Sequence, residues 1–260
     1  LSTAPHAYRS RTIMNTRLPA PSLATAPVRR FSAFRSRPRP ARVAAALLIA
    51  ATCFPGAHAA ETVDLAVKGV IRPSACSASL SGGAIADFGT ISARTLSATA
   101  ATVLPPRIVT LTIACDTATK VGISTADNRG GTVNEAASNA LISTPGYTFG
   151  VGEIGGKTIG AYSLMLGSNA GVQATADGAS VTAIYSQDGG KQWISSLLGP
   201  AQPGVRLHSW SPSTDSPPAA YKLITQPIKV TLALGKTGDL PPLDQEVQID
   251  GFATISLRYL

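Results

Sequence analysis

The sequence predicts an all-β domain of short antiparallel strands, on three observations. Runs rich in β-branched and aromatic residues recur along the chain, clusters of Gly, Asn, Asp and Pro separate them, and helical periodicity is almost absent after the first 60 residues. The runs are TVDLAVKGVI, RIVTLTIAC, KVGIST, GYTFGVG, KTIGAYSLMLG, SVTAIYS, YKLITQPIKVTLALG and EVQIDGFATISLRYL. Strands at this spacing, with few charged residues, favour a β-sandwich.

Residues 1–59 are predicted to be an export leader. Nine arginines and no Asp or Glu precede Ala60. An apolar run from Val43 to Phe54 follows the arginines and is too short for a lasting membrane span. Ala57-His58-Ala59 then supplies the small-x-small pattern of a signal-peptidase site. We therefore expect a cleaved signal peptide and an exported protein.

The basic character of the chain belongs to this leader. Removing nine of the 22 Lys and Arg residues leaves 13, against 14 Asp and Glu. A nearly neutral remainder predicts no nucleic-acid partner and no binding to an anionic membrane surface. Because the apolar run is too short to span a bilayer, no stable membrane insertion is predicted either. Its length of about 200 residues suits one domain, which we place at 71–260 after a short segment at 60–70.

Two cysteines follow the leader, Cys76 and Cys115. An exported chain with two cysteines most simply forms one disulfide. Closing a loop of about 40 residues would stabilise the domain by roughly 4 kcal/mol. A zinc site is disfavoured because only His208 remains to join the two thiols.

The motifs that could indicate catalysis have simpler interpretations. GVGEIG has the letters of a dinucleotide fingerprint, but a strand-like run follows it, so a β-hairpin turn and no cofactor are predicted. His208 lies in a Pro- and Ser-rich stretch from Leu198 to Tyr221, which is predicted to be a long surface loop with a solvated histidine. No nucleophile–base pair and no distinctive carboxylate pair is visible, so the protein is not predicted to be an enzyme. Trp193 and Trp210 could form a sugar-stacking platform, although core packing is favoured.

The last fifteen residues alternate in the manner of a strand with one apolar face. The apolar members of this terminal run are Val247, Ile249, Ala253, Ile255, Leu257 and Tyr259, followed by Leu260.

Several motifs occur in an order typical of one family. Gly69, Ile71, Pro73 and Cys76 form a G-x-I-x-P-x-x-C-like start. An FG-x-I strand follows at Phe88 to Ile91, a second strand ends at Cys115, and the terminal run carries a penultimate Tyr259. In these motifs the chain resembles the subunits of chaperone–usher fimbriae, and its middle resembles the larger beta-fimbria-type subunits.

The resemblance implies an incomplete immunoglobulin-like sandwich that lacks its last strand. The terminal run would then border an open groove, and a periplasmic chaperone would fill the groove and anchor the carboxylate of Leu260. At an outer-membrane usher, the amino-terminal extension of a neighbouring subunit would replace the chaperone. Here that donor would be residues 60–70, with Val63, Leu65 and Val67 alternating along it.

The expected function is therefore that of a structural subunit of a cell-surface fimbria. Each donor side chain fully buried in a neighbour's groove would contribute roughly 1.5–3 kcal/mol. Three alternatives stay open. Residues 61–72 could be the first strand of a complete sandwich. The protein could instead be a fimbrial tip adhesin, or a secreted β-sandwich that binds carbohydrate or protein.

Overall fold

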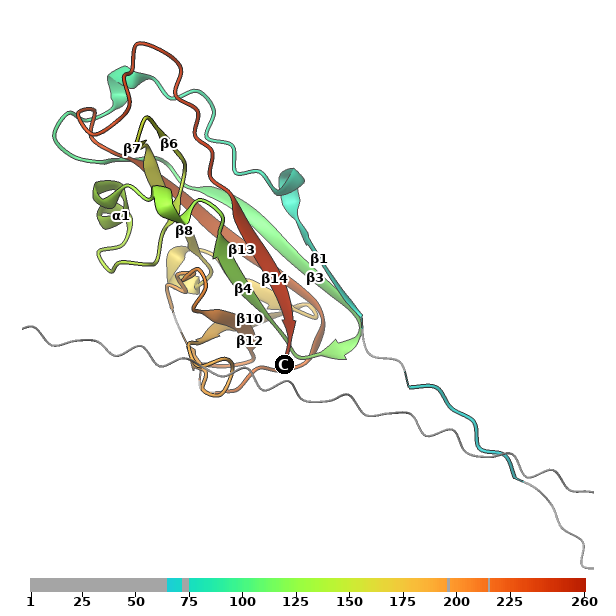
Figure 1. Cartoon of the computed structure of the whole chain (residues 1–260). Helices are drawn as coiled ribbons and strands as arrows, with labels where there is room; N and C mark the ends of the chain where they lie inside the picture. The colour runs from blue at the N-terminus through green and yellow to red at the C-terminus, as the bar shows by residue number, and fades with distance from the viewer. Residues whose placement is uncertain (1–64, 72–74, 196, 215) are drawn as a thin grey trace, which may run out of the picture. The chain divides into compact units, whose positions relative to one another are not determined.

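The computed structural model describes residues 65–71, 75–195, 197–214 and 216–260. The chain divides after Ala66, and the unit from Val67 to Leu260 contains every helix and strand described (Figure 1). The fold is an all-β sandwich with one disulfide, which confirms the predicted class.

Two groups of antiparallel strands form the layers. The first contains β1 (Cys76–Leu80), β2 (Thr102–Val103), β3 (Arg107–Thr119), β5 (Phe149–Gly150), β8 (Gly160–Met165), β9 (Ala174–Ala176) and β13 (Tyr221–Leu234). The second contains β4 (Val121–Asp127), β10 (Ala179–Ser186), β11 (Ile194–Ser195), β12 (Leu207–Ser211) and β14 (Ala253–Tyr259). Because β10 also pairs with β9, the two layers are joined through one shared strand.

Short elements complete the domain. They are the hairpin of β6 (Glu153–Ile154) and β7 (Lys157–Thr158), the helix α1 (Glu135–Leu141), and the 3₁₀ turns η1 (Ser81–Ala84), η2 (Ala93–Thr95), η3 (Gly130–Thr132) and η4 (Ser168–Ala170). The hairpin confirms the turn predicted at GVGEIG. Gly155 and Gly156, at its tip, have φ values of 58° and 78°, which a tight hairpin requires of both central residues.

The strand order places β1 and β14 at opposite ends of one continuous path, β1-β3-β13-β9-β10-β12-β4-β14 (Figure 1). In the part of the chain that the structure describes, β1 pairs only with β3 and β14 pairs only with β4. These two strands are therefore free edges.

The core lies between the layers and includes one large polar contact. Trp210, with only 1% of its surface exposed, donates its indole N–H to Oε1 of Gln226 at 2.8 Å. The Gln226 amide in turn donates to the carbonyl of Leu166 at 3.0 Å. Buried Trp and Gln side chains are tolerated because each finds a partner. The favoured interpretation of Trp210 as a core residue is confirmed, and its proposed role in stacking a ligand is wrong.

The prediction that residues from Leu198 to Tyr221 form one long loop is also wrong. This stretch contains β12, which pairs with β10 and β4. This strand is polar yet buried. Ser209 Oγ donates to the carbonyl of Val121 at 2.7 Å, and Ser211 Oγ donates to that of Ser216 at 2.9 Å. Small hydroxyls that bond the neighbouring backbone allow burial without an apolar sequence.

His208, on β12, is buried and not solvated as predicted. Neither ring nitrogen has a hydrogen-bond partner among the described residues, and the ring lies 6.2 Å from that of Tyr185. Burial, and to a smaller extent the positive charge of the nearby Arg206 guanidinium, together lower the pKa of His208 to about 3. That guanidinium lies over the Tyr185 ring, 3.7 Å from its centroid, and 4.7 Å from that of Tyr147. The imidazole is therefore neutral at pH 7.

Two further strand predictions are wrong. The FG-x-I segment is not a strand, because Gly89 has a φ of 64° and the chain from 85 to 92 is irregular. Among the described residues before Cys76, none lies in a strand either, since 65–71 and Ala75 are outside any strand. β1 is therefore the first strand of the described part of the chain.

Candidate functional site: an apolar groove between the edge strands

An open hollow lies between residues 80–91, which follow β1, and residues 247–255, which lead into β14. It has two adjoining parts of about 540 and 670 Å³, which share Ile85, Ala86, Phe88 and Ile249. We call the two parts together the edge groove. Its floor is apolar and comes from the first layer, through Val109, Tyr162, Leu164, Ile228, Val230 and Leu232. The hollow therefore reaches down to the core of the sandwich, whose side chains along this line are each less than 10% exposed.

Both edges of the groove carry backbone groups that point away from their single partner strand. Asp116 N–H donates to the carbonyl of Ala75, so the alternation turns the backbone groups of Cys76, Ala78 and Leu80 away from β3. On β14, the bonds to β4 are made by even-numbered residues, as in the donation from Asn128 N–H to the carbonyl of Phe252. The backbone groups of Ala253, Ile255, Leu257 and Tyr259 therefore face the open side.

The first wall of the groove is formed by residues 80–91, which follow β1 and no longer pair with β3 beyond Leu80. Ser81 Oγ accepts from the backbone N–H of Thr110 at 2.8 Å, in place of a further backbone pair. Gly82 and Gly83 then adopt positive φ values of 61° and 65° and turn the chain. Farther along, Arg107 Nε donates to the carbonyl of Asp87 at 2.9 Å, which ties the wall back to β3.

The second wall is formed by residues 247–255, and it is only partly a strand. Asp250 N–H donates to the carbonyl of Val151 at 2.9 Å, and the Asp250 carboxylate accepts from Nε of Arg129 at 3.1 Å. Because β4 ends at Asp127, the segment before Ala253 bonds to these residues instead of to a strand, and the predicted terminal strand starts at Ala253 instead of Val247. Val247 and Ile249 still line the edge groove, but from irregular chain.

Gly251 lets the second wall lie against the groove floor. A Cβ at this position would lie 2.9 Å from Cε1 of Tyr162 and 3.3 Å from Cγ1 of Val151. The Tyr162 ring cannot easily yield, since it stacks on Phe149 with centroids 5.1 Å apart. Burial raises the pKa of the Tyr162 phenol, and Asp127 adds to this rise, so the side chain is neutral at pH 7.

Substituting Gly251→Ala is expected to destabilise the domain by about 1–3 kcal/mol, as overpacking does elsewhere. Gly238→Ala is the matched control, because a Cβ there would meet nothing within 4 Å. Urea unfolding followed by tryptophan fluorescence measures both. Equal midpoints for the two variants would show that the Tyr162 contact is easily relieved.

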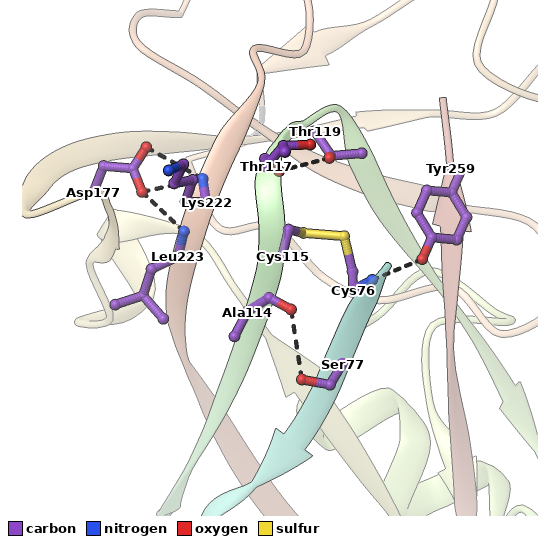
Figure 2. The surroundings of a disulfide bond; sticks show 10 residues. All are labelled: Cys76, Ser77, Ala114, Cys115, Thr117, Thr119, Asp177, Lys222, Leu223 and Tyr259. Carbon is purple, nitrogen blue, oxygen red and sulfur yellow. Dashed lines mark hydrogen bonds between the residues drawn. A yellow bond between two sulfur atoms is a disulfide. The ribbon is translucent and has the colours of Figure 1, made fainter. Parts of the chain in front are cut away.

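A side chain crosses between the two edge strands at one end of the edge groove. Tyr259 Oη, on β14, accepts a hydrogen bond of 2.9 Å from the backbone N–H of Cys76, at the start of β1 (Figure 2). Cys76 also forms the predicted disulfide with Cys115, its direct partner in β3. The hollow does not extend to this end, since its lining stops at Leu80 on β1 and at Ile255 on β14.

The rim of the edge groove exposes large apolar side chains. Ile85 on the first wall is 68% exposed, and Phe252 on the second is 57% exposed. An alternating pattern predicts neither, because Phe252 is on an even position and Ile85 follows a glycine turn. Exposed apolar groups on both sides of an apolar floor mark a surface that gains free energy when covered.

The remaining site residues predicted from sequence lie in different places. Ala253 and Ile255 line the groove, Leu257 packs against the core, and Leu260 is exposed beyond Tyr259. Leu65 and Val67 are 88% and 89% exposed and line no hollow. Val63 is outside the described residues.

Trp193 is half-buried in the turn between β10 and β11. Its indole N–H donates to the carbonyl of Gly190 at 3.0 Å. In the same turn, backbone N–H donation from Gln192 and the hydroxyl of Ser186 hold the pKa of Asp188 below its usual value. These contacts are typical of a structured turn, and with Trp210 in the core the two indoles form no joint platform.

No group of three or more His, Cys, Asp or Glu side chains in the described part of the chain could hold a metal ion. Among the helices described there, none has the length and apolarity needed to cross a bilayer.

Comparison with known proteins gives relatives of similar length. Residues 65–163 match a family model described as a protein of unknown function, DUF1120. The chain is 28% identical over 246 residues to the uncharacterized protein YhcF of Escherichia coli K12, covering 82% of this chain and 98% of that protein. It is 26% identical over 254 residues to the protein GltF of the same strain, covering 87% and 99%.

Proposed function

We propose that the edge groove accepts an extended segment of another polypeptide as an added strand, and that the protein is a structural subunit of a surface fimbria. The observation that carries this proposal is a hollow with an apolar floor, which lies between two strands that each pair on one side only. A single strand in this position would cover the floor and satisfy both backbone edges, which otherwise invite aggregation.

The segment at 60–70 is our candidate donor. In its described part the residues from Leu65 onward form no strand, and Leu65 and Val67 are exposed. This supports an extension outside the sandwich over a first strand of a complete sandwich. Alternate apolar side chains suit the groove, because one face of an inserted strand would contact its floor.

The same proposal includes the assembly partners and the location. An exported subunit with an open groove needs a temporary occupant, for which a periplasmic chaperone is suited, and an outer-membrane usher would then exchange it for the extension of a neighbouring subunit. Residues 1–59, which would direct export, lie outside the described part of the chain. An adhesin that stacks a sugar is less well supported, since Trp210 is buried. We infer no catalytic role.

The test uses the whole oxidised chain carrying Leu65→Asp and Val67→Asp, so that its own extension cannot serve as donor. A synthetic peptide of residues 61–70 should raise the melting temperature. At a free peptide concentration 100 times Kd, binding stabilises by about 2.7 kcal/mol, which corresponds to roughly 5–10 °C in a domain of this size. A peptide with Asp at the Leu65 position should have no effect.

A pair of isoleucine variants locates the binding surface. Ile85→Asp, on the rim, should abolish the shift in melting temperature. Ile108→Asp should preserve it, because Ile108 is similarly exposed, at 55%, but lies outside the groove lining. The proposal fails if the wild-type peptide gives no shift, or if both variants respond alike.

A further inference from the structure

We infer that Tyr259 is a positioning residue that fixes where an accepted strand ends, an inference that rests on the proposed function of the edge groove. The starting observation is the hydrogen bond from the Cys76 N–H to Tyr259 Oη, which joins the two edge strands directly (Figure 2). Its consequence depends on which backbone groups of β1 face the open side.

Cys76 and Cys115 form the kind of antiparallel pair whose backbone groups point away from each other. The bond from Asp116 N–H to the carbonyl of Ala75 makes the preceding pair the bonded one. The Cα atoms of Cys76 and Cys115 are 4.0 Å apart, as expected for the closer, non-bonded kind of pair. The N–H of Cys76 is therefore the first donor that β1 could offer to a strand in the groove.

Tyr259 Oη takes this donor, in the place where an inserted strand would put a backbone carbonyl. The next outward positions on β1 are Ala78 and Leu80, and Leu80 already lines the hollow. On the opposite edge, Ile255 is the last lining residue of β14 before Tyr259. An accepted strand can thus pair with β1 at Leu80 and Ala78, and it ends where it meets the phenol.

This arrangement defines a register as well as an end. An inserted strand that slips by one residue presents its polar face to the floor. The apolar floor opposes a slip of one residue. A slip of two residues keeps the apolar side chains on the floor, so only a fixed end point for the strand opposes it. Tyr259 supplies that second restriction, because its side chain reaches from β14 to β1 at a single place.

Amide hydrogen exchange tests the assignment in the oxidised chain with Leu65→Asp and Val67→Asp. Without peptide, the amide of Cys76 should be protected, and Tyr259→Phe should remove that protection. With the 61–70 peptide, the amides of Ala78 and Leu80 should gain protection while that of Cys76 stays as it was. Tyr147→Phe, outside the groove lining, is the control and should change none of the three.

Peptide length gives a second readout. The 61–70 peptide is extended by one Thr-Val pair at each end in turn. When Tyr259 is present, the extension that points toward Cys76 should change Kd less than about twofold. In Tyr259→Ala, the extension that points toward Cys76 should tighten binding about tenfold or more, as one further buried valine would. In Tyr259→Phe, the gain should be smaller, because the ring still obstructs the strand.

The outcomes separate the two proposals. If the 61–70 peptide binds, and the extension toward Cys76 tightens binding to the chain with Tyr259 as much as to Tyr259→Ala, the Tyr259 side chain moves aside. The proposed stop is then wrong, while the proposed groove is kept. If the amide of Cys76 exchanges equally fast with and without the Tyr259 hydroxyl, the stop is likewise wrong. If no peptide binds any variant, the proposed function is wrong and the stop falls with it.

Discussion

Replacing both Cys76 and Cys115 with alanine is expected to lower the free energy of unfolding by about 4 kcal/mol, the value for a closed loop of this size. The two cysteines are 39 residues apart in sequence. Local opening of β1 should increase more than that of the other strands, because β1 has a partner strand on one side only. Without the disulfide, β1 is held by its hydrogen bonds to β3 and by the contact of Cys76 with Tyr259.

Urea denaturation of the double variant and of the oxidised parent measures this loss. Amide exchange should also accelerate more in β1 than in β13, which pairs along both of its sides. The parent treated with a reductant should behave as the double variant does. A difference in unfolding free energy below about 1 kcal/mol would show that the unfolded chain gains little freedom when the disulfide is removed.

Acidification from pH 7 to pH 4 is expected to cost roughly 3 kcal/mol of stability through His208 alone. The folded state keeps this imidazole neutral down to a pKa of about 3, whereas the unfolded chain binds a proton near 6.5. The unfolded state therefore holds more protons between these values, and stability falls as the pH falls through this window. Above pH 6.5 the contribution to stability is complete.

His208→Leu isolates this effect from the titration of carboxylates. Leucine is similar in volume, and the two ring nitrogens that it removes have no hydrogen-bond partner among the described residues. Unfolding free energies measured at pH 7, 6, 5 and 4 should decline about 1.4 kcal/mol per unit less steeply in the variant over the middle of the range. Parallel curves for the two proteins would mean that His208 becomes protonated without unfolding, beside Arg206 and Tyr185.

The sequence pattern predicts the long strands because their burial follows their alternation. In β3, Val109, Leu111 and Ile113 face the core as the run RIVTLTIAC predicts. The hairpin at Gly155 and Gly156 is predictable for another local reason, because adjacent glycines suit a turn with positive φ. The disulfide is predictable because only two cysteines follow the predicted export leader. None of these features requires knowledge of distant contacts.

The features missed by the sequence depend on partners far along the chain. β12 is polar in sequence, and its burial depends on hydroxyl bonds such as the one from Ser209 to Val121. The helix α1 is too short for periodicity, and its one local signal is Asn134, whose side chain caps the N–H of Ala137. In the site, Phe252 and Ile85 reach the groove rim through irregular chain, which no alternation rule describes.

The disulfide at the first residue of β1 also governs how the domain would respond to mechanical force. A pull on the chain ahead of Cys76 passes through a covalent bond into β3, which is paired with β13 along most of its length. The five-residue β1 therefore does not have to withstand the load through its own hydrogen bonds. Tension is shared in shear across the long central strands, and the wall of the groove keeps its shape while the chain is stretched.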